Sequence, residues 1–269
     1  MIGIVGAVCG DIIGSTYEFK PVKSIPYDFD IVTDTMMPTD DTTCTIAVAD
    51  WLLHTNRTHD DLVEKLYEWC NKRPAGFGPM FLEWLKRGDG QPYGSLGNGS
   101  AMRVSPVAWV AQSLEECSNL AKISAEVTHN HPEGIKGAQV TTAAIFLNRH
   151  GYDKEYIKNY IESNFEGYEI PEYDFIKSIH KFNCTCPYSV IASLSAWYYS
   201  NSYEDCIRKA VSMNGDTDTE ACIAGSICNA NKETQIDDEL LLNVINNANN
   251  MDNDIIDLIN EFHDKYEIS

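Results

Sequence analysis

The stretch "NGDTDTEACIAGS", residues 214–226, joins a short polar motif to a segment of small and apolar residues. The motif carries two carboxylates, Asp216 and Asp218, and two hydroxyls, Thr217 and Thr219. The segment that follows is too apolar for a surface helix, which needs one polar face. We therefore expect a buried helix that begins with acidic groups.

A second stretch, "PTDDTTCTIAVADWLLH" at residues 38–54, repeats this arrangement. Thr39, Asp40 and Asp41 precede another segment that is too apolar to be a surface helix. Two clusters of carboxylates and hydroxyls, each at the start of a buried helix, can contribute to one site although they are far apart in the sequence. The two stretches therefore predict that the first and last parts of the chain meet.

Two interpretations explain such clusters. Asp and Thr cap helices well, with about 1 kcal/mol of stabilisation for one cap, but a single residue is enough for each cap. Four buried aspartates without compensation would cost several kcal/mol through desolvation and mutual repulsion, which a divalent cation would relieve. Oxygen ligands without His or Cys favour magnesium, manganese or calcium. The spacing alone leaves both independent caps and a shared metal site open.

The rest of the sequence is typical of an all-α protein. Apolar residues recur at helical spacing in several segments, for example Leu62, Leu66 and Trp69, and sustained period-two alternation is absent. There is no internal repeat, low-complexity tract or long linker. We expect a single compact helical domain over residues 1–269, with residues 231–269 forming a last pair of helices that cap the fold.

Two further patterns in the sequence concern the predicted helices: capping motifs at helix N-termini and a row of glycines on the first helix. Ser113 with Glu116, and Ser202 with Asp205, resemble capping boxes, the second less closely because Asp replaces Glu or Gln. In the first predicted helix, glycines recur every four residues and form a smooth face that lets another backbone approach. Each glycine lowers helix propensity by roughly 1 kcal/mol, so we expect a reason in packing or in binding. The three glycines are Gly6, Gly10 and Gly14.

Composition excludes several classes of protein. Lys and Arg total 20 against 40 Asp and Glu, a net charge of −20, so we expect no direct binding to nucleic acid. No apolar run reaches the roughly 18 residues of a membrane span, and no secretory signal peptide is recognisable. Nine cysteines, an odd number set mostly among apolar residues, favour a reducing cytoplasm. His180, Cys184 and Cys186 suggest a zinc cluster, but free thiols are favoured because a fourth ligand is missing.

Five motifs occur in order within about residues 1–230: "GAVCGDIIGSTYEF" (6–19), "PTDDTTCT" (38–45), "GNGSAMRVSPVAW" (97–109), "THNHPEGIKGAQ" (128–139) and "NGDTDTEACIAGSI" (214–227). Together they resemble the ADP-ribosylglycohydrolase family, which includes dinitrogenase reductase activating glycohydrolase and the ADP-ribosylhydrolases. Two positions depart from the usual pattern of that family. Asn214 replaces the first glycine of the usual Gly-Gly before Asp-Thr-Asp, and Asn130 replaces a proline between two histidines, and neither change removes a metal ligand.

The resemblance implies an all-helical fold with two magnesium ions, or manganese as the alternative, at the base of a cleft. It implies catalytic roles for Glu18, Asp41 and Asp218. The implied metal ligands are Thr39, Asp40, Asp41, Asp216, Asp218 and Thr219. The residues implied to contact the diphosphate and distal ribose, together with a pocket histidine, are Gly94, Ser95, Asn98, Gly99, Ser100, Met102 and His129.

Some of these residues also have structural interpretations. The stretch "YGSLGNGSAM" suits a diphosphate because glycines let backbone amides approach, yet an ordinary glycine-rich turn has the same composition. His129 suits a helix end as well as a pocket, and Asp11 suits either support of the metal ligands or a buried structural role.

The resemblance implies hydrolysis of the bond between ADP-ribose and a modified acceptor, with ADP-ribosylarginine on protein as the first choice. Cleavage builds positive charge on the sugar, so we expect the ions to orient the ribose and acidify a water while the aspartates stabilise that charge. Glu18 would accept the proton of this water or control access to the ions. Alternatives are serine-linked ADP-ribose, O-acetyl-ADP-ribose, another ADP-ribosylated small molecule, or a non-catalytic protein that binds ADP-ribose or confers immunity.

Overall fold

The structure is a computed structural model that describes residues 3–18, 24–73 and 76–266. Fifteen helices and no β-strand occur in these residues, so the predicted all-α fold class is confirmed. The helices are α1 (Val5–Ser15), α2 (Asp40–His54), α3 (His59–Lys72), α4 (Pro79–Arg87), α5 (Gly99–Met102), α6 (Ser105–Val110), α7 (Leu114–Glu126), α8 (Pro132–Arg149), α9 (Lys154–Asn164), α10 (Tyr173–Ile179), α11 (Cys186–Tyr198), α12 (Tyr203–Ser212), α13 (Thr217–Cys228), α14 (Asp238–Asn247) and α15 (Asn253–Tyr266).

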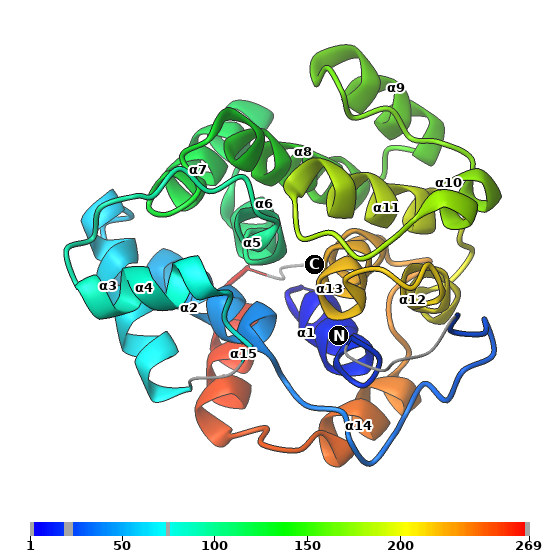
Figure 1. The fold of residues 1–269 in the computed structure, drawn as a ribbon, viewed down its shortest axis with the longest axis horizontal. Coiled ribbons are helices and arrows are strands. Elements are labelled where there is room, and N and C mark those ends of the chain that lie inside the picture. Colours follow the sequence, from blue (N-terminus) through cyan, green and yellow to red (C-terminus); the bar gives the residue numbers. More distant parts are fainter. Residues whose placement is uncertain (1–2, 19–23, 74–75, 267–269) are drawn as a thin grey trace.

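The centre of the fold is the pair of helices α1 and α13, which lie side by side with the other helices around them (Figure 1). All twelve residues of α13 are buried, and α1 is buried from Val5 to Gly14. Neither helix has a polar face toward solvent, because neighbouring helices cover every side. The first and the last of the five motifs therefore supply the inner pair.

The glycine stripe of α1 is the surface on which α13 packs. A Cβ at Gly10 would lie 2.2 Å from the carbonyl oxygen of Ala221, and one at Gly14 would lie 2.3 Å from that of Thr217. These distances are too short for any side chain, so the two backbones are in direct contact. Packing is therefore the reason for the glycines, and it holds the start of α13 against the end of α1.

Helix α2 is the third buried helix of the centre, and every residue from Asp41 to Leu53 is buried. It packs against α1, and its other sides contact α3, α6 and α15. Figure 1 shows α2 on the side of α1 opposite to α12. This arrangement brings the N-termini of α2 and α13 toward the end of α1.

Several helix starts carry the caps that the sequence predicts. Ser113 and Ser202 each accept a hydrogen bond from the backbone amide three residues later. Neither motif forms the reciprocal box that it resembles, because Glu116 accepts from the amide of Gln112 and Asp205 accepts from the amide of Asn201. These caps satisfy amides that would otherwise lack a partner at the helix ends.

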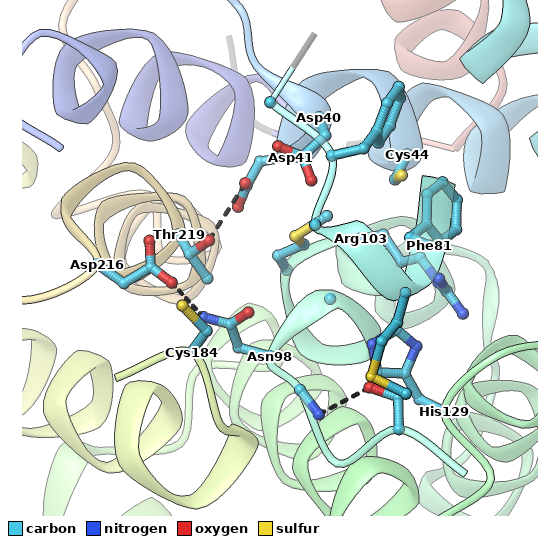
Figure 2. Close-up of a pocket in the computed structure, with 18 of the residues that line it drawn as sticks. Asp40, Asp41, Cys44, Phe81, Asn98, Arg103, His129, Cys184, Asp216 and Thr219 are labelled. Atoms are coloured by element: carbon cyan, nitrogen blue, oxygen red, sulfur yellow. Dashed lines mark hydrogen bonds between the residues drawn. The ribbon is translucent and has the colours of Figure 1, made fainter. Parts of the chain in front are cut away.

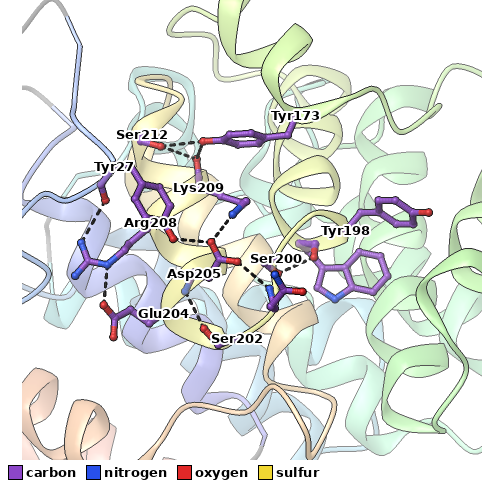
Figure 3. Close-up of polar contacts among 12 residues, drawn as sticks. Tyr27, Tyr173, Tyr198, Ser200, Ser202, Glu204, Asp205, Arg208, Lys209 and Ser212 are labelled. Atoms are coloured by element: carbon purple, nitrogen blue, oxygen red, sulfur yellow. Dashed lines mark hydrogen bonds and ion pairs between the residues drawn. The ribbon is translucent and has the colours of Figure 1, made fainter.

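Residues 27–29, which precede α2, are bound to side chains of α12 (Figure 3). Tyr27 donates to Asp205 at 2.7 Å, and Arg208 donates to the carbonyl oxygen of Phe29 at 2.7 Å. Arg208 also pairs with Glu204 one turn earlier on α12. Tyr27 and Phe29 are thus held beside the helix that covers α13.

The last two helices, α14 and α15, pack against α1 and α2. Arg73 holds the start of α15 through two hydrogen bonds of 2.7 Å to Asp252, and Phe262 is fully buried. Within the described ranges, none of the helices has the length and apolar character that crossing a membrane requires.

Candidate metal centre and substrate cleft

The N-termini of α2 and α13 meet at one site. The hydroxyl of Thr219 donates to Asp41 at 3.2 Å, although 178 residues separate the two in sequence. Figure 2 shows this contact, with Asp40 and Asp41 above and Asp216 to the left. Among the described residues, two sets of three carboxylates have oxygens within 4.8 Å of one another: Asp11 with Asp41 and Asp218, and Glu18 with Asp216 and Asp218.

The start of α2 is held by a carboxylate of α1. Thr39 has extended backbone angles, and its hydroxyl accepts from the amide of Asp41 at 3.2 Å, as an N-cap does. The carboxylate of Asp11 accepts from the Thr39 amide at 2.9 Å, the Thr39 hydroxyl at 2.7 Å and the Thr42 amide at 3.0 Å, and also from the Thr42 hydroxyl. Asp11 therefore fixes the first turn of α2 and is itself 0% exposed.

The start of α13 is held differently. Asp216 occupies the cap position without a capping hydrogen bond, and its carboxylate accepts from the side-chain amide of Asn98 at 2.7 Å (Figure 2). Thr217 donates to the carbonyl oxygen of Gly14 at 2.9 Å, which ties the first turn to α1. Asp216 thus faces the glycine-rich loop before α5.

Burial and mutual repulsion dominate the electrostatics of this site. Burial raises the pKa of Asp40 well above its usual value, and the negative charge of Asp11 raises it further. The pKa of Asp41 is raised for the same two reasons. The pKa of Asp218 is also raised, first by burial and then by the charge of Asp41.

This donor set fits hard cations. The oxygen Oδ1 of Asp41 is buried and has no hydrogen-bond partner among the described residues, although buried carboxylate oxygens normally have one. Carboxylate and hydroxyl oxygens are the ligands that magnesium, manganese and calcium prefer. A cation at this position would supply the missing partner of Asp41 and lower the repulsion among the aspartates.

Glu18 lies just after α1, beside Asp216 and Asp218. Burial, with smaller contributions from the charges of Asp216 and Asp11, raises the pKa of Glu18 to about 7. A carboxylate with a pKa near neutrality can both accept and release a proton, as a general base requires.

A cleft of about 480 Å³ opens from this acidic floor. The glycine-rich loop forms one wall, through Ser95, Gly97, Asn98 and Gly99, and the loop is held to the start of α11 by a hydrogen bond of 2.8 Å from the Asn98 amide to the Cys184 carbonyl. The opposite wall is apolar, and its main residues are Phe77, Pro79, Met80 and Phe81 near α4, with Phe182 at the rim. A ligand here would contact the acidic groups of the floor, the glycine-rich loop and the aromatic rings.

Most predicted site residues line this cleft, and three do not. The lining includes Glu18, Asp40, Asp41, Ser95, Asn98, Gly99, Met102, His129, Asp216, Asp218 and Thr219. Thr39 contacts Asp11, and Ser100 donates to the carbonyl oxygen of Gly134 at 2.7 Å. Gly94 is exposed, and its amide donates to Asn130 at 2.7 Å. The side chains of Thr39 and Ser100 are thus engaged in the protein, and Gly94 lies outside the lining.

The disfavoured zinc cluster of His180, Cys184 and Cys186 is not among the possible metal-binding groups of the described residues. His180 is buried and pairs with Glu220 at 2.7 Å, whereas Cys184 is exposed at the cleft. The thiol of Cys186 is buried and donates to the carbonyl oxygen of Gly97 at 3.1 Å. Separate thiols therefore remain the preferred interpretation.

The pair of His180 and Glu220 was not recognised from the sequence. Burial raises the pKa of Glu220 to about 7, against the opposing effect of His180, and one of its oxygens has no hydrogen-bond partner in the described structure. A Cβ at Gly215 would lie 2.3 Å from His180 Nε2, so the pair sits directly under the loop that carries Asp216. The one available signal was an acidic residue inside the buried helix, a turn after Asp216.

Comparison with known proteins agrees with the fold. A model of the family described as ADP-ribosylglycohydrolase matches residues 3–267. The chain belongs to the ADP-ribosylglycohydrolase family. Among its relatives in this family, ADP-ribosylhydrolase ARH3 of Mus musculus is 27% identical over 178 residues, which is 55% of this chain and 48% of that protein.

ADP-ribosylarginine hydrolase Tri1 of Pseudomonas putida is 26% identical over 263 residues, which is 84% of this chain and 68% of that protein. A solved structure described as an ADP-ribosylglycohydrolase-related protein complex superposes with a TM-score of 0.76 at 19% identity, over 97% of this chain and 95% of that one. The ADP-ribosylglycohydrolase fold therefore extends over nearly the whole chain. The alignment to ARH3 spans only about half of that relative.

Proposed function

We propose that this member of the ADP-ribosylglycohydrolase family is a metal-dependent hydrolase that cleaves the bond between the anomeric carbon of ADP-ribose and a modified acceptor. One observation carries the proposal: Asp41 of α2 and Thr219 of α13 are in contact, and an acidic floor therefore lies beside a glycine-rich loop. A cation-binding floor beside a glycine-rich wall that a ligand can approach closely suits a ribose joined to a diphosphate.

The residues proposed to hold two magnesium ions, with manganese as the alternative, are Asp40, Asp41, Asp216, Asp218 and Thr219, with Thr39 at the edge of the set. Bound ions would supply positive charge that orients the ribose hydroxyls and acidifies a water. The unpartnered oxygen of Asp41 and the raised pKa values of the aspartates support this assignment.

The protein groups have separate roles in this mechanism. Glu18 removes a proton from the attacking water, because its carboxylate lies beside Asp216 and Asp218 and its pKa is about 7. Asp41 and Asp218 lie in the floor and stabilise the positive charge that develops on the sugar. Asn98 orients Asp216 through its 2.7 Å hydrogen bond and joins the loop to the floor.

ADP-ribosylarginine on protein is the first choice of substrate. A guanidinium acceptor would carry a positive charge, which the acidic groups Glu18 and Asp40 favour, and its planar face would stack on Phe77 or Phe182 at the rim. The name of the relative Tri1, an ADP-ribosylarginine hydrolase, supports the same choice. Serine-linked ADP-ribose, O-acetyl-ADP-ribose and other small ADP-ribosylated molecules are the alternative substrates.

The test is release of free ADP-ribose from proteins modified on arginine or on serine, and from O-acetyl-ADP-ribose, with magnesium or with a chelator. We expect the fastest release from arginine and none with the chelator. Release that is insensitive to the chelator would contradict the metal mechanism, and tight binding without release would favour the non-catalytic alternative.

Glu18→Gln gives the sharpest test of the general base. The variant keeps the size of the side chain and removes the proton acceptor. We therefore expect turnover to fall by about 100-fold or more, with magnesium binding retained. Glu83→Gln, on the exposed side of α4, is the matched control. Full activity of Glu18→Gln would remove Glu18 from the mechanism.

A further inference from the structure

A buried chain of polar groups lies behind the glycine-rich wall of the cleft. Arg103, only 1% exposed, donates to the hydroxyl of Thr128 at 2.9 Å. The same hydroxyl lies 2.7 Å from Nδ1 of His129, whose ring lines the cleft. Thr128 is completely buried, so water cannot replace either contact.

The direction of the hydrogen bond between Thr128 and His129 follows from the donors and acceptors. The guanidinium of Arg103 has only N–H donors, so the Thr128 oxygen accepts from it. The hydroxyl proton of Thr128 then has one acceptor among the described residues, Nδ1 of His129. The reverse arrangement would leave this buried proton without an acceptor, which protein interiors rarely tolerate.

A neutral imidazole carries one proton, so a ring that accepts at Nδ1 must carry its proton at Nε2. Burial and the positive charge of Arg103 lower the pKa of His129 well below its usual value, which keeps the ring neutral. Nε2 makes no hydrogen bond within the described residues. It faces the glycine-rich loop, since a Cβ at Gly99 would lie 3.0 Å from it.

We propose that Arg103 and Thr128 are positioning residues that fix His129 as the Nε2–H tautomer, a hydrogen-bond donor aimed at the glycine-rich loop. The ligand group that such a donor recognises is an oxygen acceptor, a phosphate oxygen or a ribose oxygen of ADP-ribose. The choice of ligand rests on the proposed function, whereas the tautomer follows from the protein alone.

The arrangement has a consequence for selectivity. A neutral donor at Nε2 favours an oxygen acceptor and disfavours an N–H or ammonium group at the same place. Among the described residues, no carboxylate contacts the guanidinium group of Arg103, and the Nε of Arg103 has no hydrogen-bond partner. This end of the cleft is therefore positive, opposite in sign to the acidic floor, and suits the anionic part of the ligand.

The tautomer can be read from ¹⁵N chemical shifts of the full-length protein in a long-range ¹H–¹⁵N correlation spectrum at neutral pH. The chain has seven histidines, and the signals of His129 are assigned by their loss in His129→Gln. We expect a neutral ring with its proton on Nε2. A proton on Nδ1, or a charged ring, would overturn the proposal whatever the variants do.

Thr128→Val removes the hydroxyl while keeping the shape of the side chain, and Thr128→Ser restores the hydroxyl. We expect the valine variant to lose the fixed tautomer and to bind ADP-ribose, with magnesium present, about 10-fold more weakly by titration calorimetry. The serine variant should retain both properties. Thr141→Val on α8 is the matched control, because Thr141 is equally buried and its hydroxyl has no partner among the described residues.

Unchanged shifts and affinity in Thr128→Val would overturn the positioning role, and so would equal losses in the Thr141→Val control. If Thr128→Val does not fold, the wild-type and Thr128→Ser spectra still decide the tautomer. If the wild-type protein fails to bind ADP-ribose, the proposed function is wrong, and the spectrum remains the independent test of the tautomer.

Discussion

The two acidic helix starts that form the floor of the cleft differ in what holds them. The start of α2 is fixed inside the protein, where Asp11 accepts hydrogen bonds from both Thr39 and Thr42. The start of α13 has no side-chain cap, and its Asp216 reaches out to Asn98 of the glycine-rich loop. One acidic start is therefore supported from below, and the other is joined to the wall of the cleft.

The comparison shows that the composition of a helix start does not determine its role. Both starts carry two aspartates and threonine, yet ordinary capping is present only at α2, where Thr39 accepts from the amide of Asp41. Helix capping and metal binding are not exclusive alternatives at α2, because a capped first turn still places Asp41 at the site. The neighbouring element decides which groups remain available for a ligand.

We expect the greatest loss of stability from a change at the contact that positions the start of α13. In Gly14→Ala the new methyl group would lie 2.3 Å from the Thr217 carbonyl oxygen, so the first turn of α13 has to move. Such overpacking costs about 3 kcal/mol, a large part of the stability of a typical domain. We expect a lower midpoint in urea denaturation, followed by circular dichroism, and loss of hydrolysis.

Gly78→Ala is the matched control for this change, because nothing lies within 4 Å of its Cβ position. Its stability should stay within about 0.5 kcal/mol of the wild type. An unchanged midpoint in Gly14→Ala would mean that α1 and α13 do not need their close approach.

The next effect concerns the support of α2. In Asp11→Asn one acceptor oxygen becomes an amide, which cannot accept from the Thr39 or Thr42 amides. We expect a loss of about 2 kcal/mol in the free energy of unfolding of the metal-free protein, measured with chelator present. Asp257→Asn, exposed on α15, should have no such effect. Equal stability of Asp11→Asn and wild type would contradict the role of Asp11 as the support of α2.

Asp216→Asn should separate stability from metal binding. Removing one charge from the floor relieves repulsion, because the charge of Asp216 contributes to the raised pKa of Asp218. We expect an unchanged or higher melting temperature with chelator. The wild type should gain about 2.7 kcal/mol at a magnesium concentration 100 times its Kd, and the variant much less. An equal gain in both proteins would exclude Asp216 as a metal ligand.

The smallest effect lies at the opposite end of α2, far from the floor. His54 contacts Asp50 and Glu261, each at 2.8 Å, and the hydrogen bond with Asp50 raises the pKa of His54 above its usual 6.5. A raised pKa means that the contribution is fully present below pH 6.5 and is lost as the pH rises through the higher folded value.

His54→Gln should therefore lower stability by less than about 1 kcal/mol at pH 6, and the difference from wild type should shrink toward pH 8. Melting temperatures measured across this range, with the magnesium-dependent rise as an internal control, check the prediction. A change in that rise would mean that the two ends of α2 are coupled.

The fold class and the central helices were predictable because burial leaves a strong signal in this sequence. Small and apolar residues on all sides of residues 217–228, and glycines four apart in the first helix, indicate inner helices. The sequence could not indicate which helix the glycines contact, since any close backbone would explain them. In the structure, the glycines contact the carbonyl oxygens of Ala221 and Thr217, so the partner is α13.

For the candidate site, the acidic groups were predictable and their supports were not. Two motifs predicted that Asp41 and Asp218 would lie close together, and the structure places them within one carboxylate cluster. Asp11 fitted a structural and a supporting role equally well, and only its contacts with Thr39 favour one. The buried position of Arg103 could not be predicted from the sequence, because a single arginine after a glycine-rich loop is usually solvated.

The contact between α1 and α13 has a consequence for synthesis of the protein on the ribosome. Residues 5–15 leave the ribosome early, but the helix that covers their glycines follows roughly 200 residues later. At ordinary rates of translation this is a delay of about 10 to 40 seconds, during which α1 lacks its principal neighbour. The apolar residues of α1 therefore stay exposed to water and to other chains until α13 has been made.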